Sequence, residues 1–547
     1  TDESRLDMML LGILVFWCNG DAEQIDRLFR QSGRMRPDKW DRSLGATTYG
    51  MFSIQKQIAV AKEFYSPIGR HPATEDFSID FETLSILHPE NNSLYSWTDI
   101  GFGRLFADYY KSIARYVPEK KIWRCYADGI WNDDIGSLRV MELCKKLADA
   151  LMFYTISLEN ERLKKDYLDY CRKWQLRRYR ETILKDAQSV YPVPISCFDC
   201  HPDLFNCANG TLNLKTGAFM EHNPEDFLTK HSNVNYDPRA DCKRFETFIR
   251  EITSNDIDKA DFLQKAFGYG ISGDTRYECL FVLYGASTRN GKGTLCESVL
   301  KVLGNYGCTT RPETISVKSN TNSGNPTEDI ARLAGIRFAN ISEPGRGLVF
   351  NAAQVKSMTG NDTINARFLH ENSFDFSPQF KLYINANYLP VIHDMTLFSS
   401  GRVVIIPFDR HFDEAEQDKT LKHQFTRPEN QSAILNWLLK GYNLLMKEGL
   451  TQPQSVKDAI NAYHHDSDKI TLFLEDAMEE NPGAEVRTSV AYTHYRQWCM
   501  ENGHFSENIK NFKQALEATA TVVRRRPRSG GSETTLLLGY TIRGDFL

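Results

Sequence analysis

Short apolar runs along this chain alternate with segments in which apolar residues recur every three or four positions. Runs with the length and composition of buried strands occupy residues 280–284, 336–341, 380–384 and 403–406. The segment 295–303, which follows the first run, has the spacing of an amphipathic helix, and the pair Gly304-Asn305 predicts its end. Residues 246–455 are therefore predicted to form an α/β domain.

The pattern changes on both sides of this domain. Residues 1–66 have helical periodicity, and residues 67–97 are rich in Pro, Asn, Ser and acids, which predicts a linker. Residues 98–245 mix helical segments with short strands and predict an α+β module. Residues 456–547 predict three short helices, the third capped by Ser506, and then two strands around an arginine-rich turn, which is the order of a winged helix. The predicted class is an α/β multidomain protein with a helical and mixed N-terminal module.

The composition is that of a globular protein of several domains. Of the 547 residues, 41% are hydrophobic and 25% are charged, and the formal net charge of −5 argues against an all-over basic coat, although local basic patches remain compatible with it. Twelve scattered cysteines favour a reducing cytoplasm. The apolar run 8–18 is too short to cross a bilayer, so no membrane association is expected. Zinc is disfavoured because no second C-x-x-C pair accompanies Cys197, Cys200, His201 and Cys207.

The most specific chemistry lies in Phe281–Thr294, where an apolar strand runs into a glycine-rich turn and then a helix. Glycines let backbone N–H groups close around phosphate oxygens, and the helix N-terminus adds partial positive charge. A lysine then reaches the β- and γ-phosphates, and a hydroxyl holds Mg²⁺. Gly293 stands where Ser or Thr usually follows the lysine, and five residues rather than four separate the flanking glycines. The residues predicted to bind ATP and Mg²⁺ are Gly285, Asn290, Gly291, Lys292, Gly293 and Thr294.

Polar residues beside the later strands complete a predicted hydrolysis site. Glu343, after the second strand, is predicted to bind Mg²⁺ and activate the attacking water. Asn387, preferred over Asn385 because it begins an Asn-x-x-Pro turn, is predicted to sense the γ-phosphate. Arg402, just before the last strand, is predicted to act as a finger on the ATP of a neighbouring subunit. The alternative for Glu343 is an exposed glutamate before a turn, and the alternative for Arg402 is a solvated loop arginine.

Four segments in this order resemble the motifs of a known motor family. Residues 284–294 resemble Walker A, and residues 340–344 resemble Walker B. Residues 356–367 resemble the B′ motif special to superfamily 3, and residues 381–390 resemble the sensor motif. The chain thus resembles the helicase part of phage and plasmid primase-helicases, which are related to the poxvirus-type primase-helicase. The module that precedes this motor in the family is resembled by residues 97–105, 126–131, 209–214 and 261–268.

The resemblance implies an AAA+-like P-loop ATPase that forms a hexameric ring and translocates on single-stranded or forked DNA, with 3′ to 5′ polarity. Residues 16–41 resemble the segment that follows an archaeo-eukaryotic-type primase or polymerase domain. We therefore expect the C-terminal part of a primase-helicase, with a fused or associated primase domain. ATP and Mg²⁺ are the expected cofactors, and a phage origin would place the protein in the host cell cytoplasm.

Three other functions fit parts of the pattern. An ATP-dependent initiator or loader, which remodels origin DNA without processive unwinding, would carry the same motor motifs. A DNA-binding replication regulator switched by ATP would need neither Glu343 nor Arg402 for turnover. A small-molecule P-loop kinase is disfavoured because it needs neither a B′ segment nor a winged helix.

Basic and aromatic side chains indicate where DNA is expected to bind. The alternation at 363–367 and 374–376 predicts a hairpin, which projects into the ring channel in superfamily 3, with Phe368 either stacking on a base or packing in the core. The basic segment 161–185 predicts either a solvated helix face or a DNA contact. The cationic residues predicted to contact DNA are Lys356, Arg367, His370, Lys510, Lys513, Arg524, Arg525, Arg526 and Arg528.

Overall fold

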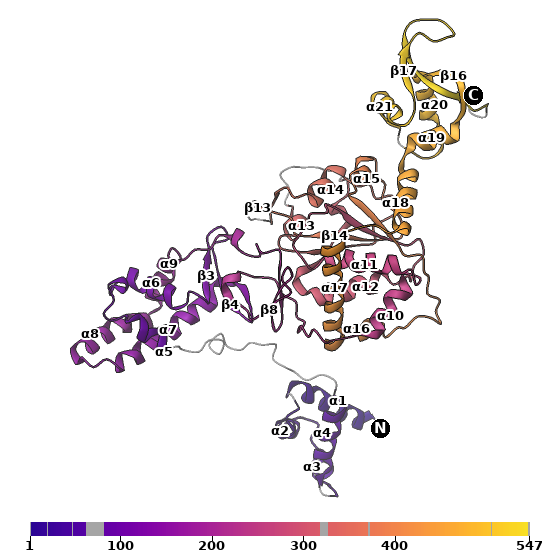
Figure 1. The fold of residues 1–547 in the computed structure, drawn as a ribbon. Coiled ribbons are helices and arrows are strands. Elements are labelled where there is room, and N and C mark those ends of the chain that lie inside the picture. The colour runs from indigo at the N-terminus through magenta and orange to yellow at the C-terminus, as the bar shows by residue number, and fades with distance from the viewer. Residues whose placement is uncertain are drawn as a thin grey trace. The chain divides into compact units, whose positions relative to one another are not determined.

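The computed structural model divides the chain into two compact units (Figure 1). One unit comprises residues 1–109 and 137–190, and the other comprises residues 110–136 and 191–547. The structure describes residues 2–18, 20–45, 47–61, 81–317, 327–369, 372–504 and 506–544. The predicted module 98–245 is divided between the two units, because its long helices belong to the first and its strands to the second.

The first 61 residues form a small helical bundle. Its elements are α1 (Asp2–Trp17), α2 (Ala22–Arg30), α3 (Pro37–Trp40), β1 (Ser43–Leu44), β2 (Thr47–Thr48) and α4 (Tyr49–Val60). Asp21 and Thr48 cap α2 and α4 by accepting bonds from backbone N–H groups of the first turn. Phe29 and Trp40 stack in the core with their ring centroids 3.9 Å apart, which fixes the short α3 against α2.

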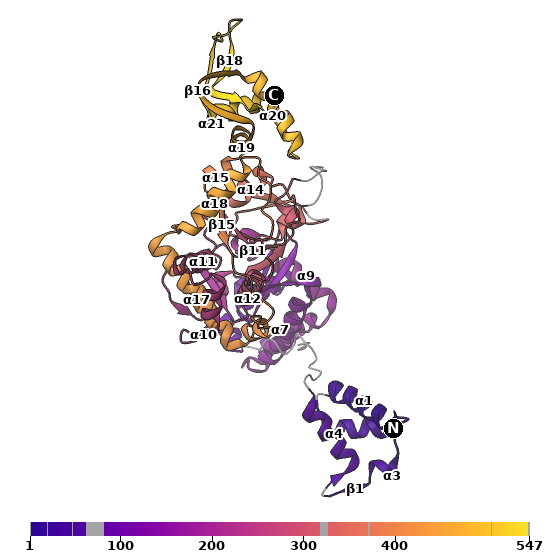
Figure 2. The ribbon, with the colours of Figure 1, turned by 90° about the vertical axis from the view of Figure 1, so that its right-hand side faces the viewer.

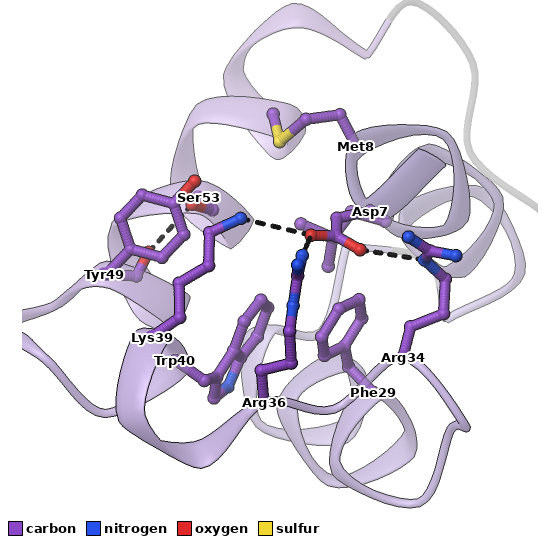
Figure 3. A pocket seen from close by; sticks show the side chains of 10 residues that line it. Asp7, Met8, Phe29, Arg34, Arg36, Lys39, Trp40, Tyr49 and Ser53 are labelled. Carbon is purple, nitrogen blue, oxygen red and sulfur yellow. Dashed lines mark hydrogen bonds and ion pairs between the residues drawn. The ribbon is translucent and has the colours of Figure 1, made fainter. Parts of the chain in front are cut away.

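One carboxylate of this bundle is surrounded by three cations (Figure 3). The side chain of Asp7 is 10% exposed and accepts hydrogen bonds from Arg34 at 2.8 Å, from Lys39 at 3.2 Å and from Arg36. Burial raises the pKa of the Asp7 carboxyl, but the three cations outweigh burial and hold that pKa below its usual range. The cluster therefore ties α1 to the segment around α3.

A second group of helices completes the first unit. It contains α5 (Phe81–Leu87), α6 (Asp99–Tyr109), α7 (Leu138–Ile156), α8 (Glu161–Cys171) and α9 (Arg177–Ala187). The basic segment 161–185 lies on α8 and α9, where it carries short-range ion pairs such as Arg172–Asp169 at 2.9 Å and Arg177–Glu181 at 2.8 Å. These pairs favour the solvated helix face over the DNA contact.

Two small antiparallel sheets open the second unit. One contains β3 (Ala114–Val117), β4 (Ile122–Ala127) and β5 (Ile130–Asp134), and the other β6 (Leu204–Cys207), β7 (Gly210–Asn213) and β8 (Phe219–Met220). Cys207 is 1% exposed and packs in the main hydrophobic core. Within the described ranges, no three His, Cys, Asp or Glu side chains gather as a metal site.

A five-stranded parallel sheet forms the centre of the second unit. In the order β10-β11-β14-β9-β15, its strands are Gly307–Thr310, Phe338–Ser342, Lys381–Ala386, Leu280–Tyr284 and Val403–Pro407. Successive side chains of a strand point to opposite faces, so Phe281 and Leu283 enter one core while Leu280 and Val282 enter another. A parallel sheet buried on both faces explains why its strands read as continuous apolar runs.

Helices cover both faces of this sheet (Figures 1 and 2). One core includes residues of α10 (Lys243–Ile252), α11 (Ile257–Tyr269), α12 (Lys292–Leu303), α16 (Leu421–Phe425) and α17 (Pro428–Glu448). The other includes residues of α13 (Glu328–Ala331), α14 (Ala352–Thr359), α15 (Thr396–Ser399) and α18 (Gln454–Ser467). All five strands are parallel, so their carboxyl ends meet at one edge, where open α/β sheets bind ligands.

A buried arginine joins this sheet to the segment before β6. Arg337 is 1% exposed, and its guanidinium donates to the carbonyl oxygens of Ile271 at 2.8 Å, His201 at 3.1 Å and Leu204 at 2.6 Å. It also lies over the ring of Tyr306, 4.4 Å from the centroid. The cation is thus stabilised by backbone dipoles and an aromatic face.

The C-terminal residues form a helical and β domain. Its elements are α19 (Lys469–Ala477), β16 (Met478–Arg487), α20 (Thr488–Glu501), α21 (Ile509–Thr519), β17 (Val522–Arg525) and β18 (Thr534–Ile542). The predicted hairpin is present as β17 and β18, and β16 adds a third strand. The cap of α21 is Asn508, which accepts from Asn511 N–H, and the prediction of Ser506 was wrong. None of the helices in the described part of the chain has the length and apolarity that a membrane span requires.

Candidate nucleotide-binding site

The loop between β9 and α12 forms a cradle that only glycine can line. Gly291 has a φ of 86°, and a Cβ there would lie 2.3 Å from Ile252 Cγ2. A Cβ on Gly285 would lie 2.2 Å from Asn290 Nδ2 and 2.6 Å from the carbonyl oxygen of Phe408. Asn290 Nδ2 closes the loop by donating to the carbonyl oxygen of Ser287 at 2.7 Å.

Gly293 and Thr294 begin the helix beside this cradle. The position of a Cβ on Gly293 has no heavy atom within 4 Å, so this departure from the usual motif leaves open space at the helix N-terminus. Thr294 is half-buried and its carbonyl oxygen accepts from Ser298 Oγ at 2.8 Å, which orders the first turn. The hydroxyl of Thr294 therefore stands one residue later than the Ser or Thr hydroxyl of the usual motif.

Lys292 lies under the loop and is 5% exposed. Its ammonium donates to Asn387 Oδ1 at 3.1 Å and to the carbonyl oxygen of Gly285 at 3.3 Å. Burial lowers the pKa of Lys292 to about 8, against the opposing effect of the carboxylate of Glu343. Three residues predicted from separate strand ends thus come together around one ammonium group.

The positions of these residues follow from strand order. Glu343 and Asn387 come directly after β11 and β14, and Lys292 is the first residue of α12, which follows β9 after the glycine-rich loop. β11, β14 and β9 are neighbours in the sheet. Glu343 is exposed and has a φ of 44°, and its N–H donates to the carbonyl oxygen of Asn385 at 3.0 Å. A bulky side chain held at positive φ is strained, and such strain is concentrated at functional sites.

Asn385, the residue passed over in favour of Asn387, has a different place. It is 8% exposed, and its Nδ2 donates to Asn340 Oδ1 at 2.8 Å while its Oδ1 accepts from Cys296 Sγ at 3.5 Å. Asn340 in turn donates to Ser342 Oγ at 3.0 Å. This buried chain of amides connects α12, β14 and β11 directly beneath the site, and no local sequence pattern predicts it.

Arg402 precedes β15 at the edge of the sheet opposite to the cradle, since Val403 pairs with Leu280 at the start of β9. Its guanidinium forms an ion pair with Glu278 at 2.8 Å and donates to Thr359 Oγ1 at 2.8 Å, and its side chain is 18% exposed. Arg402 thus connects α14 to the segment before β9 within its own chain, and its predicted role on the ATP of a neighbouring subunit stays a prediction.

A cavity of about 330 Å³ adjoins the cradle and was missed by sequence reasoning. Its lining includes Gly291, Thr294, Phe248, Phe412, Arg244 and Lys422. The segment after β15 closes over the loop, because Phe412 N–H donates to the carbonyl oxygen of Arg289 at 3.0 Å and Arg289 donates to Gln417 Oε1 at 3.1 Å. Two aromatic rings and two cations beside a phosphate cradle suit a nucleoside. No motif marks this segment, so only the tertiary fold brings it to the site.

The predicted hairpin near the B′-like segment is present. β12 (Ile364–Ala366) pairs antiparallel with β13 (Phe374–Phe376), and Phe368 stacks on Phe374 with centroids 5.8 Å apart. Phe368 is half-buried against the core, which leaves both predicted roles open. Thr327 N–H donates to the carbonyl oxygen of Arg367 at 3.1 Å, and Arg367 N–H donates to Thr327 Oγ1 at 3.0 Å. His370 lies outside the described residues.

Two predicted DNA-contacting cations are held by carboxylates of their own chain. Lys356 Nζ lies 2.8 Å from Asp394 Oδ2 and donates to Thr396 Oγ1 at 2.7 Å, which corrects its assignment as a free phosphate contact. Arg525 forms an ion pair with Glu485 at 2.7 Å, and this pair connects two strands of the C-terminal sheet. The remaining C-terminal candidates are on the domain surface, with Lys513 partly buried and the others exposed: Lys510, Arg524, Arg526 and Arg528.

Three family profiles match separate parts of the chain. The profile described as NrS-1 polymerase HBD domain matches residues 3–67, D5 N terminal like matches residues 103–254, and Poxvirus D5 protein-like matches residues 465–547. The last match coincides with the domain of α19–α21 and β16–β18. Each profile covers less than half of the chain.

The chain is also similar to proteins of large DNA viruses and a phage. It is 26% identical over 323 residues to helicase candidate 022R of Frog virus 3 (isolate Goorha), covering 56% of this chain and 31% of that protein. It is 26% identical over 349 residues to helicase candidate L207/L206 of Acanthamoeba polyphaga mimivirus, covering 59% and 36%. The chain thus spans about a third of the length of these relatives.

A third relative matches a short segment at higher identity. This is the DNA primase-polymerase of Nitratiruptor phage NrS-1, 43% identical over 70 residues, which are 13% of this chain and 10% of that protein. Among solved structures, the apo NrS-1 C-terminal region aligns at 10% identity with a TM-score of 0.43, covering 81% of this chain and 99% of that one.

Proposed function

We propose that this chain, a relative of phage and poxvirus-type primase-helicases, is the ATP-driven motor part of a DNA replication helicase. The motor would be an AAA+-like P-loop ATPase of superfamily 3 that works as a hexameric ring on single-stranded DNA. The observation that carries the proposal is the group of Lys292, Asn387 and Glu343 at the carboxyl ends of three neighbouring strands, beside a glycine-lined cradle. The names of the viral relatives support the same reading.

The cradle fits a Mg²⁺-bound triphosphate. Gly285 and Gly291 leave space that a Cβ would fill, and Lys292 has only neutral oxygens as hydrogen-bond partners, which phosphate oxygens would replace. Mg²⁺ would neutralise charge that develops on the phosphates, held by the hydroxyl of Thr294 and by Glu343. The adjacent cavity, with Phe248 and Phe412, would take the nucleoside.

Each residue then has a defined task in hydrolysis. Lys292 would leave Asn387 and donate to the β- and γ-phosphate oxygens. Glu343 would accept a proton from the attacking water, and the amide of Asn387 would orient that water. Because Arg402 is held within its own chain, we propose a structural role for it in place of the finger on a neighbour's ATP.

The flanking domains would bring DNA to the motor. Arg524, Arg526 and Arg528 around the β17–β18 hairpin, with Lys510 on α21, would bind DNA phosphates. The match of residues 3–67 to a segment of a primase-polymerase supports a fused or associated primase domain. We therefore propose that the motor unwinds DNA for a primase.

The decisive test is ATP hydrolysis with and without single-stranded DNA, measured together with particle mass by mass photometry. We expect DNA-stimulated turnover, a six-subunit species, and loss of turnover in Lys292→Ala and Glu343→Gln. A Lys292→Ala variant with full DNA-stimulated activity would refute the proposal. Turnover without strand displacement on a long forked substrate would instead indicate an initiator or loader.

A further inference from the structure

The second unit contains a cavity of about 490 Å³ that the proposed motor cycle does not use. Part of its lining comes from the β12–β13 hairpin, with Thr363 and Phe376 at its base and Phe368 and Phe374 toward its loop. Another part comes from the two segments before the motor, with Lys120, Arg124 and Phe198. Its volume lies in the range of about 300–1,000 Å³ that proteins use for small organic ligands.

Aromatic faces line this cavity. The rings of Phe368 and Phe374 are stacked with an interplanar angle of 15°, and Phe376 continues the row 5.9 Å beyond Phe374. All three are half-buried, so each ring presents part of its surface. The guanidinium of Arg124, which also lines the cavity, lies 4.2 Å from the centroid of Phe198, and both side chains are buried. Aromatic faces such as those of the three phenylalanines stack on nucleobases without regard to sequence.

The charged side chains around the cavity differ in whether they already have hydrogen-bond or ion-pair partners. The carboxylate of Asp199 accepts from the N–H groups of Thr229 and Lys230, and Asp375 accepts from Asn365 Nδ2 at 2.7 Å. Arg124 and Lys120 share Asp133 at 2.6 and 3.8 Å.

Two further cations have no such partner. Among the residues that the structure describes, the side chains of Lys230 and Arg332 form no ion pair, and Arg332 is exposed. Both line the cavity, where the local anions already accept hydrogen bonds. They are therefore available to an anion from outside the chain.

We propose that this cavity binds nucleotides, with a base stacked on the phenylalanines of the hairpin and a phosphate held by Lys230 and Arg332. The inference rests on the proposed function and adds a second DNA contact to it, one built jointly by the hairpin and the preceding module. The same chemistry would suit a strand of DNA or a free nucleotide. Because the cavity includes the hairpin base, a strand bound there would be moved whenever the hairpin moves.

The test compares charge-reversed variants of the full chain in binding to fluorescein-labelled (dT)₂₀ by fluorescence anisotropy over a series of NaCl concentrations. In Lys230→Glu/Arg332→Glu we expect affinity to fall by about ten-fold for each lost contact. The slope of log affinity against log salt should become shallower by about 0.7 for each contact. The control is Arg427→Glu, which removes an exposed arginine outside the cavity and should bind (dT)₂₀ as the wild type does. Equal affinity and salt slope in the double variant and the control, together with no binding of dTMP to the wild type, would overturn the proposal.

A competition experiment distinguishes the two sources of nucleotide. If a DNA strand is the ligand, millimolar dTMP leaves (dT)₂₀ bound, and the double variant loses DNA-stimulated but not basal ATP hydrolysis. If a free nucleotide is the ligand, dTMP binds the wild type directly and not the double variant. Retention of basal hydrolysis separates failure of this inference from failure of the proposed motor function.

A second measurement requires no variant to fold. A (dT)₂₀ strand that carries 5-iododeoxyuridine forms photo-crosslinks to aromatic side chains, and the crosslinked peptides are identified by mass spectrometry. We expect crosslinks to Phe368, Phe374 or Phe376, together with Phe198. Crosslinks confined to the C-terminal domain, with none in these peptides, would contradict the proposal.

Discussion

The buried ammonium of Lys292 predicts how nucleotide affinity depends on pH. Burial lowers its pKa to about 8 in the free protein, whereas binding a triphosphate requires the charged form. About nine-tenths of the lysine is protonated at pH 7 and about one-tenth at pH 9 if the pKa is about 8. The affinity for ATP should therefore fall by roughly ten-fold between these two values.

The stability of the free protein should change in the opposite direction. A lysine whose folded pKa is about 8 and whose unfolded pKa is about 10.5 costs the folded state about 3 kcal/mol near neutral pH, since one pKa unit is about 1.4 kcal/mol. The unfolded chain binds more protons between these two pKa values, so this cost decreases as the pH rises from about 8 to about 10.5. Nucleotide affinity and intrinsic stability thus diverge above pH 8.

The assay is a titration with a fluorescent ATP analogue at pH values from 7 to 9.5, on the wild type and on Lys292→Arg. The arginine keeps its charge throughout this range, so any binding that the variant retains should be nearly independent of pH. A wild-type affinity that is constant from pH 7 to 9 would refute the argument that Lys292 must be recharged to bind phosphate. The same slope in both proteins would assign the pH dependence to another group.

Three further predictions address other residues. Gly291→Ala places a Cβ 2.3 Å from Ile252 at a φ of 86°, so it should abolish binding of the ATP analogue while circular dichroism of the chain is kept. Arg402→Ala should lower the melting temperature, because Glu278 and Thr359 lose their partner. If Arg402 is not a finger, mixing Arg402→Ala with Lys292→Ala subunits should lower ATP hydrolysis only in proportion to the fraction of Lys292→Ala subunits. Asp7→Asn should destabilise the N-terminal bundle by about 1 kcal/mol in urea melts, because the three cations that lose their partner are each about a third exposed. Because the pKa of Asp7 is lowered, its stabilising effect should be complete above the unfolded pKa of about 4 and be lost below it as the carboxyl is protonated.

The strands and the cradle could be predicted because their signals are local. A strand buried on both faces needs a continuous apolar run, and a phosphate cradle needs glycines at fixed distances from a lysine. The meeting of Lys292, Glu343 and Asn387 also followed, because Glu343 and Asn387 come just after strands, Lys292 begins the helix after a third strand, and parallel strands end at one edge. The choice of Asn387 over Asn385 matched the geometry at Lys292.

Sequence reasoning missed ion pairs between residues that are distant in sequence. Arg402 pairs with Glu278, Lys356 with Asp394 and Arg525 with Glu485, and no local pattern predicts such pairs. For the same reason the nucleoside cavity and the amide chain beneath the site were missed. Residues 98–245 were predicted to form one module because their helices and strands alternate in sequence, although the fold assigns them to different units.

The guanidinium of Arg337 has a consequence for how short the motor can be made. Two of its three carbonyl acceptors, on His201 and Leu204, precede the first helix of the α/β core. A truncated chain that begins at Lys243 would keep the cation and lose those acceptors, and an uncompensated buried charge destabilises a fold by several kcal/mol. Such fragments should be insoluble or unfolded, whereas a fragment that begins at Tyr191 retains every acceptor of Arg337. The smallest stable fragment that contains the α/β core is therefore longer than the one its sequence motifs delimit.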